Sequence, residues 1–140
     1  MKHICYISIG SNLGDKLLNC KHAIQQLEYF SKILKKSSFY ETQPWGYQDI
    51  SDYINAVLKI ETFLDSISLL HKLKMIEKKM GRISKKSGLV YESRIIDLDI
   101  LFYDDIIIND KEITIPHPKL YYRNYVLEPF FEIDPNFKCP

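Results

Sequence analysis

The segment 95–103 is the most apolar stretch of the chain, and only two charged residues, Asp97 and Asp99, interrupt it. A short apolar run of this length predicts a β-strand that lies in the protein core. Side chains at positions i and i+2 of a strand share a face, so both carboxylates point one way while Leu98 points into the opposite layer. The sequence therefore predicts a strand with one face in the core and both aspartates on the other.

The two aspartates are candidate metal ligands. Their Cα atoms would lie roughly 6.5 Å apart along a strand, so both side chains can reach one cation or a close cation pair. Carboxylates this close repel each other, and at least one pKa would rise without compensation. Mg²⁺ supplies that compensation, because it takes few protein carboxylates and completes its octahedron with water and substrate phosphates. The alternative is a pair of solvated aspartates, which leaves unexplained why both interrupt the most apolar strand.

Strand-like and helix-like patterns alternate along the rest of the chain. We expect strands over residues 4–9, 37–42, 53–62 and 106–108, and amphipathic helices over residues 15–29 and 69–81. Asp15 is placed to cap the start of the first helix, and Gly81 to end the second. The order of these elements predicts an α+β sandwich, with helices packed on one face of a mainly antiparallel sheet.

Length and charge restrict the class of protein. The 140 residues suffice for one core, so we expect a single domain over residues 1–140. The formal net charge of +1 provides no overall field for nucleic acid or an anionic membrane. No segment approaches the ~20 apolar residues of a membrane helix. Three scattered cysteines, Cys5, Cys20 and Cys139, indicate reduced thiols, so we expect a soluble cytoplasmic protein.

Cationic side chains are frequent around the two aspartates. Transfer of a phosphoryl or pyrophosphoryl group depends on positioning and on neutralising the charge of the phosphate oxygens. Arginine suits this work because its planar guanidinium can bind two oxygens at once. Arg94, three residues before Asp97, is the strongest candidate, while each lysine has the alternative of a solvated surface charge. The other candidates are Arg82, Lys85, Lys86, His117, Lys119 and Arg123.

An aromatic ring and an amide alternate onto one face of another expected strand. Tyr53 and Asn55 lie opposite Ile54 in the alternation. A flat heteroaromatic ligand is typically stacked by such a ring and recognised by such an amide through donor and acceptor pairing. The alternative is an ordinary outward strand face. The nearby residues that could close the pocket are Thr42, Pro44 and Trp45.

The first expected strand ends in the turn Gly10-Ser11-Asn12-Leu13-Gly14. A strand-to-helix turn of this kind can bind an anion through backbone N–H groups. It lacks the Gly-Lys-Ser/Thr ending of a P-loop, so this feature alone indicates little.

Taken in order, these motifs resemble the 6-hydroxymethyl-7,8-dihydropterin pyrophosphokinase family over nearly the whole chain. The matching segments are 6–14, 38–42, 53–55, 94–101 and 115–118, with single matches at Pro44, Gly46, Glu77, Gly81, Arg82 and Arg123. The resemblance implies a ferredoxin-like α+β fold. It also implies transfer of the β,γ-pyrophosphate of ATP to the pterin hydroxymethyl group, with release of AMP, in folate synthesis.

The resemblance also implies roles for particular residues. Asp97 and Asp99 match the family's magnesium ligands, and we expect two Mg²⁺ ions with ATP. The positions that match the pterin site are Thr42, Pro44, Trp45, Tyr53, Asn55 and Tyr125. The positions that match the nucleotide and phosphate site are Glu77, Arg82, Arg94, Ile100, Thr114, His117 and Arg123. We expect Arg82 and Arg94 to be catalytic together with the aspartates.

One segment departs from the family pattern. The family commonly has Arg-Trp-Gly-Pro-Arg before the aspartates, whereas this chain has Val90-Tyr91-Glu92-Ser93-Arg94. We expect Tyr91 to serve as the aromatic residue and Lys85 or Lys86 to supply the charge. The basic loop 82–93 is expected to close over bound ATP as a lid does.

Two other functions are compatible with parts of the sequence. One is a noncatalytic module of the same fold that binds pterin or nucleotide, although such a module would not need the two aspartates. The other is a metal-dependent nuclease, which would call for a more basic surface. No sequence feature fixes the oligomeric state, and we expect a monomer.

Overall fold

The computed structural model describes residues 1–42, 53–81, 95–118, 120 and 124–140. A five-stranded sheet organises this part of the chain, with strand order β2-β4-β1-β5 and β3 paired to β4. The strands are β1 (His3–Ser11), β2 (Lys32–Lys36), β3 (Tyr40–Thr42), β4 (Tyr53–Thr62) and β5 (Asp97–Tyr103). Every pairing in this sheet is antiparallel, which confirms the predicted kind of sheet.

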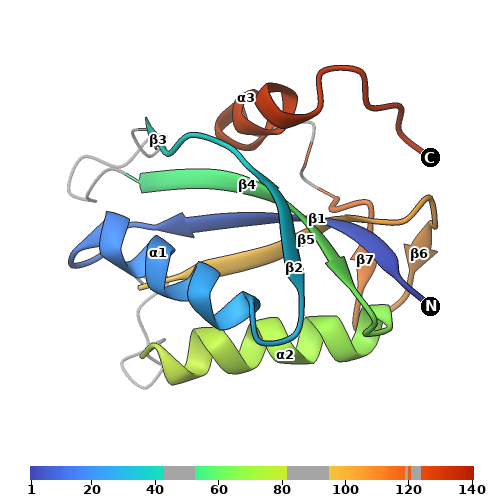
Figure 1. The fold of residues 1–140 in the computed structure, drawn as a ribbon, viewed down its shortest axis with the longest axis horizontal. Helices are drawn as coiled ribbons and strands as arrows, with labels where there is room; N and C mark the ends of the chain where they lie inside the picture. Colours follow the sequence, from blue (N-terminus) through green and yellow to red (C-terminus); the bar gives the residue numbers. More distant parts are fainter. Residues whose placement is uncertain (43–52, 82–94, 119, 121–123) are drawn as a thin grey trace.

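Helices lie on both faces of the sheet (Figure 1). α1 (Lys16–Leu27) and α2 (Ser66–Lys79) cover one face, and α3 (Asn124–Ile133) packs on the other. A second, two-stranded sheet consists of β6 (Ile108–Asn109) and β7 (Thr114–Ile115). The order of β1, α1, β2, β4, α2 and β5 is the ferredoxin-like arrangement. The two predicted helices pack on one face as expected, and α3, which the sequence analysis did not predict, covers the other face.

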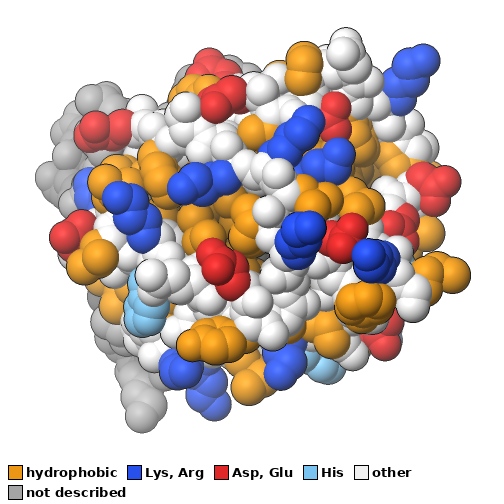
Figure 2. Space-filling model, in the orientation of Figure 1, with side chains coloured by type: hydrophobic (Ala, Val, Ile, Leu, Met, Phe, Trp, Pro, Cys, Tyr) orange, Lys and Arg blue, Asp and Glu red, His pale blue; other side chains and the backbone are white. Residues whose placement is uncertain are grey.

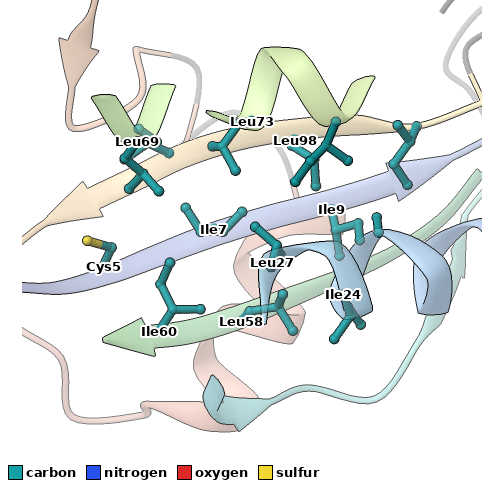
Figure 3. Close-up of a cluster of buried hydrophobic side chains, with 14 of the residues drawn as sticks. Cys5, Ile7, Ile9, Ile24, Leu27, Leu58, Ile60, Leu69, Leu73 and Leu98 are labelled. Carbon is teal, nitrogen blue, oxygen red and sulfur yellow. The ribbon is translucent and has the colours of Figure 1, made fainter. Parts of the chain in front are cut away.

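The main core lies between the sheet and the helices α1 and α2 (Figure 3). Alternate residues of the strands point into it, among them Ile7 of β1 and Leu58 of β4, and Leu27 and Leu73 meet them from the helices. All four side chains are fully buried. Burial of each such side chain contributes about 1.5–3 kcal/mol relative to exposure, so this layer holds the helices on the sheet.

A smaller, largely aromatic core lies under α3. Tyr6 and Phe102 of the sheet pack against Phe130 of α3 and Phe137 of the C-terminal segment. The ring centroids of Tyr6 and Phe130 are 4.9 Å apart, and those of Phe102 and Phe137 are 4.5 Å apart. The hydroxyl of Tyr6 donates a hydrogen bond to Asp134. The aromatic contacts therefore fix α3 and the following segment on the second face.

Three of the four predicted helix ends agree with the structure, whereas α2 begins at Ser66, three residues before the expected start at residue 69. Asp15 caps α1, and its Oδ1 accepts a hydrogen bond from the Leu18 N–H at 3.2 Å. Gly81 follows the last turn of α2 with φ 97°, a left-handed conformation that glycine adopts readily. α1 ends at Leu27, close to the expected residue 29.

Three predicted elements differ from the structure. The expected strand 37–42 is present only as β3, while β2 was missed because an exposed edge strand with three lysines shows no apolar alternation. Of the expected strand 106–108, only Ile108 belongs to β6. α3 was missed because Pro129 lies inside it and cannot donate the helical N–H bond. Its buried residues, Val126, Phe130 and Ile133, nevertheless have helical spacing.

Surface charge is mixed on the face shown in Figure 2, where Lys and Arg side chains lie among Asp and Glu side chains. This agrees with the formal net charge of +1. Among the described residues, none of the helices has the length and apolar character needed to cross a membrane.

The cysteines should differ sharply in reactivity. Burial raises the pKa of the Cys5 thiol to about 12, with the Asp104 carboxylate adding to the rise, and burial raises the pKa of Cys20 to about 12. Cys139 is exposed. Because the thiolate is the reactive form, iodoacetamide at pH 8 should label the native protein at Cys139 alone, and all three thiols in urea. Mass spectrometry counts the labels; native labelling of Cys5 or Cys20 would contradict the buried placement, and Cys139→Ser is the control.

Candidate active site

Asp97 and Asp99 begin β5, and both point away from the main core. Leu98 and Ile100 are buried in that core, whereas the two aspartates are partly exposed. The alternation predicted from the sequence is therefore present. The pairing of β5 with β1 holds both carboxylates on the face of the sheet that carries α3.

The ladder of β1 places distant residues in one row across the sheet. Gly10 lies opposite Asn55 of β4 on one side and opposite Asp97 of β5 on the other. Tyr40 of β3 lies opposite Asn55 and extends the row. Neighbouring strands are about 4.8 Å apart, so the Cα atoms of Asn55 and Asp97 are separated by roughly 10 Å. The amide expected to recognise a ring and a carboxylate expected to bind a metal thus share one face.

The side chains of β1 become smaller towards this row. On the face that carries α3, β1 presents Tyr6, then Ser8, then Gly10. Tyr6 belongs to the aromatic core, and Ser8 lies opposite Asp99. The sequence analysis placed Gly10 in a turn that could bind an anion, whereas the structure places it in β1, within the sheet.

A cleft of about 300 Å³ lies between α2, the start of β5 and the segment 113–118. Six of its lining residues were predicted as site residues from the sequence: Glu77, Asp97, Asp99, Ile100, Thr114 and His117. The structure thus brings together residues from three separate parts of the chain. Lys74 also lines the cleft. The sequence analysis missed it, although its position one turn before Glu77 on the same helix was an available indication.

Glu77 of α2 fixes the outer edge of β5. Its side chain is only 5% exposed, and its Oε2 accepts a hydrogen bond of 2.9 Å from the backbone N–H of Leu98. Leu98 lies between the two aspartates in the chain. A buried carboxylate that receives this N–H therefore helps to hold Asp97 and Asp99 in place.

His117 lies beside the acidic pair. Its backbone N–H donates to the carbonyl of Leu101 at 3.1 Å, which attaches the segment 113–118 to β5. Its Nε2 is 3.9 Å from Oδ1 of Asp99. This arrangement gives the cleft one imidazole next to two carboxylates.

The donor set of the acidic pair suits magnesium. Both groups offer hard carboxylate oxygens on one face beside an open cleft. In the described residues, no group of three or more His, Cys, Asp and Glu side chains is arranged to hold a metal ion. Mg²⁺ takes few protein carboxylates and completes its coordination with water and phosphate oxygens, so two carboxylates are a suitable protein contribution.

The expected pterin residues lie at the other end of the row. Tyr53 and Asn55 share the face of β4 opposite Ala56, and the Asn55 side chain is 6% exposed. The backbone of Thr42 in β3 lies opposite Tyr53. Tyr125 belongs to α3 on the same side of the sheet, and its side chain is 37% exposed.

Glu132 of α3 joins that helix to β3. Its Oε2 accepts hydrogen bonds from the N–H and the hydroxyl of Ser38, at 2.9 and 3.0 Å, and its Oε1 accepts one from the Tyr40 hydroxyl at 2.5 Å. These bonds lower the pKa of Glu132 and raise that of Tyr40. Sequence analysis missed Glu132, because no local pattern relates it to Ser38 and Tyr40, which lie more than 90 positions away.

Several expected site residues lie outside the described residues. They are Pro44, Trp45, Arg82, Lys85, Lys86, Tyr91, Arg94, Lys119 and Arg123, together with the lid expected at 82–93. For Thr42 only the backbone is described.

Fold and site together define a class: a ferredoxin-like α+β domain with a carboxylate pair beside a cleft on its sheet. Residues 6–135 match the family described as 7,8-dihydro-6-hydroxymethylpterin-pyrophosphokinase (HPPK). The match covers nearly the whole chain. The chain belongs to the HPPK family.

Individual relatives agree with this assignment. The 2-amino-4-hydroxy-6-hydroxymethyldihydropteridine pyrophosphokinase of Aquifex aeolicus is 40% identical over 135 residues, which cover 96% of this chain and 82% of the relative. The Haemophilus influenzae enzyme of the same name is 39% identical over 137 residues, covering 96% and 84%.

A solved structure has the same fold. The Plasmodium falciparum HPPK-DHPS crystallised with pteroate superposes with a TM-score of 0.81 at 18% identity, over 99% of this chain and 38% of that one. The chain therefore spans well under half of that longer polypeptide, and the likeness concerns the fold alone.

Loss of the Glu77 acceptor should destabilise β5. In Glu77→Leu the buried N–H of Leu98 loses its partner, at a cost of about 1–3 kcal/mol in the free energy of unfolding. Glu77→Gln keeps an acceptor oxygen and serves as the matched control with a smaller loss. Urea unfolding of both variants measures the difference, and equal stabilities would show that the hydrogen bond to Leu98 contributes nothing.

The Glu132 contacts should make stability depend on pH in acid. Since the folded-state pKa of Glu132 is lowered, its contribution is present above the ordinary glutamate pKa and is lost as pH falls through the folded value. Glu132→Gln should therefore lower Tm at pH 7, and the difference from the parent protein should shrink below about pH 4. Thermal unfolding at several pH values tests this. Glu128→Gln, on the same helix, is the charge-matched control; a constant difference across the range would contradict the assignment.

Proposed function

We propose that this chain transfers the pyrophosphoryl group of ATP to the hydroxymethyl group of 6-hydroxymethyl-7,8-dihydropterin. The products are AMP and the pterin diphosphate, an intermediate of folate synthesis. Membership of the HPPK family and the names of the relatives, which are pyrophosphokinases of this pterin, support this reaction. The observation that carries it is the pair Asp97 and Asp99, which opens onto a cleft that His117 and Thr114 also line.

Asp97 and Asp99 would hold magnesium, with two ions expected when ATP is bound. The metal supplies neutralisation of charge on the phosphate oxygens. The place of the two carboxylates at the start of β5, with Glu77 bonded to the N–H between them, supports this role. Magnesium held at this edge would lie next to any triphosphate in the cleft.

The cleft suits a nucleotide. Its apolar wall, formed by Leu70, Ile100 and Ile113, can contact a base. Thr114, Glu77 and the imidazole of His117 provide polar contacts. We place His117 at the leaving side of the triphosphate because it lies 3.9 Å from Asp99. Arg82, Arg94 and Arg123 are proposed to hold the phosphates, with the loop 82–93 closing over them.

The pterin is proposed to lie over the β4 end of the row, with its hydroxymethyl group directed towards Asp97. Tyr53 and Tyr125 would stack on opposite sides of the ring, and Asn55 would pair with its polar edge. Thr42, Pro44 and Trp45 would close the pocket. Pterins with altered ring edges should be rejected, because unmatched buried polar groups are costly.

In this proposal, catalysis depends mainly on how the two substrates are positioned. The hydroxymethyl oxygen of the pterin needs to approach the β-phosphorus of ATP in line with the bond to the leaving AMP. The residues of the row would hold the pterin and those of the cleft the ATP, both on one face of the sheet. No described side chain is assigned as a general base. We further propose that the chain acts as a monomer and that it works in the cytoplasm.

A noncatalytic binding module of the same fold is the second candidate. It would need the ring-binding residues Tyr53 and Asn55 but not a carboxylate pair at the cleft. Asp97, Asp99 and His117 lie together at that cleft, which favours the catalytic function.

The reaction can be tested directly. Purified protein with ATP, Mg²⁺ and 6-hydroxymethyl-7,8-dihydropterin should form AMP and pyrophosphorylated pterin in equal amounts, and no AMP without the pterin. Chromatography of both products provides the measurement. Binding of both substrates without formation of AMP would exclude the transferase and favour the binding module.

Asp97→Asn and Asp99→Asn should each lower kcat by about 100-fold or more, roughly 3 kcal/mol of transition-state stabilisation, because a ligand of the metal is lost. Asp105→Asn is the matched control, since Asp105 is exposed and lies beyond the end of β5. Near-normal turnover of either variant would contradict the role of the pair.

A further inference from the structure

Gly10 occupies a central position that its backbone conformation does not explain. β1 lies between β4 and β5, and Gly10 has a neighbour on each side in the ladder. Positive φ values among the described glycines occur at Gly14 and Gly81, and not at Gly10. Glycine weakens the interior of a strand relative to alanine. The glycine at this position therefore calls for another physical reason.

Among the described residues, one group lies too close to accommodate a side chain at position 10. A Cβ atom built on Gly10 would lie 2.7 Å from Oδ1 of Asn55, a distance that real Cβ contacts essentially never show. The next nearest described atoms, Cγ of Asn55 and the carbonyl oxygen of Ile54, are 3.7 Å away, which is ordinary contact. The space above Gly10 is therefore taken up by the carboxamide of Asn55.

A Cβ at position 10 would displace the side-chain amide of Asn55 and leave the fold intact. The obstructing atom is the end of a short side chain, so it can move without disturbing the backbone of either strand. To reach an ordinary contact of 3.4 Å, Oδ1 would have to retreat by roughly 0.7 Å. Asn55 is only 6% exposed, so its amide is surrounded by other protein groups. A displacement of this size would therefore change the geometry of its hydrogen bonds.

A Cβ at position 10 would affect Asp97, at the other end of the row, less than Asn55. Asp97 lies across the ladder from Gly10, but no described atom of it is nearer to the added Cβ than 3.7 Å. Gly10 is the smallest of the three residues that β1 presents on this face, after Tyr6 and Ser8. The absence of a side chain at position 10 thus acts on Asn55 selectively.

We propose that Gly10 is a positioning residue for substrate recognition: its lack of a side chain lets the Asn55 carboxamide lie across β1, where it pairs with the edge of a flat heteroaromatic ring. This inference rests on the proposed role of Asn55 in binding the pterin. It adds a specificity determinant on β1, a strand that contributes no ligand-binding side chain to the proposed function.

Gly10→Ala tests the proposal. We expect its affinity for 6-hydroxymethylpterin, used as a fluorescent probe with Mg²⁺ and a nonhydrolysable ATP analogue, to fall about tenfold or more, the scale of one disrupted buried hydrogen bond. Affinity for the nucleotide analogue should change less than about twofold, and Tm should be unchanged or slightly higher. In turnover, KM for the pterin should rise while KM for ATP is retained. Unchanged pterin affinity would overturn the proposal.

A double-mutant cycle shows whether Gly10 acts through Asn55. In the Asn55→Ala background the obstructing oxygen is absent, so adding Gly10→Ala should change pterin affinity by less than about twofold. Additive losses would overturn the proposal, because Gly10 would then act by another route. If Asn55→Ala alone leaves pterin affinity intact, the proposed role of Asn55 fails and this inference fails with it. A loss in Asn55→Ala without a loss in Gly10→Ala overturns only the role of Gly10.

Gly14→Ala is the matched control, since it makes the same chemical change with the opposite structural consequence. A Cβ there would have room, with its nearest described neighbour, Nδ2 of Asn19, at 3.8 Å, but φ is +70°. This variant should have a lower Tm and an unchanged affinity for the pterin. A fall in pterin affinity in both glycine variants would show that the effect of Gly10→Ala is not specific to the site, and would overturn the proposal.

Discussion

The backbone ladder of β1 determines where the candidate functional groups of the sheet lie. β1 pairs with β4 on one side and with β5 on the other, so Gly10 holds Asn55 and Asp97 in one row although they are far apart in the chain. A slip of one residue in either ladder would turn every side chain of that strand to the opposite face. Burial of residues such as Ile9 and Leu98 in the main core opposes that slip, because their apolar surface would become exposed.

The two faces of the sheet have different tasks. One face is packed along its length by α1 and α2, and this rigid layer fixes the strands (Figures 1 and 3). On the other face the aromatic core of Tyr6, Phe102 and Phe130 covers only part of the strands. In the Ser8 row, Val57 of β4 still belongs to this core, whereas no described residue of the Gly10 row does, and the candidate site begins there. Structural rigidity and ligand access are therefore separated along the same strands.

Local patterns in the sequence predicted the parts of the structure that depend on neighbouring residues. The alternation around Asp97, the cap at Asp15 and the antiparallel α+β architecture follow from side-chain periodicity and turn chemistry. Contacts between distant segments could not be predicted in this way. The Glu132 bonds to β3, the Glu77 bond to the Leu98 N–H and the packing of α3 depend on how the segments meet in space. The family resemblance supplied Glu77 as a site residue, but not its bond to β5.

The contacts that shape the site also affect how the sheet meets other molecules. A sheet edge offers unpaired N–H and C=O groups on which a strand from another chain can add, which leads to aggregation. At the β5 edge, Glu77 accepts the Leu98 N–H, and the His117 N–H occupies the Leu101 carbonyl. The opposite edge, β2, is short and rich in exposed lysines, which repel a neighbouring copy. Residues 77 and 117 thus serve as edge protection as well as cleft walls. The contact of residue 117 is made by its backbone, so it is the loss of the Glu77 carboxylate that would put solubility at risk together with activity.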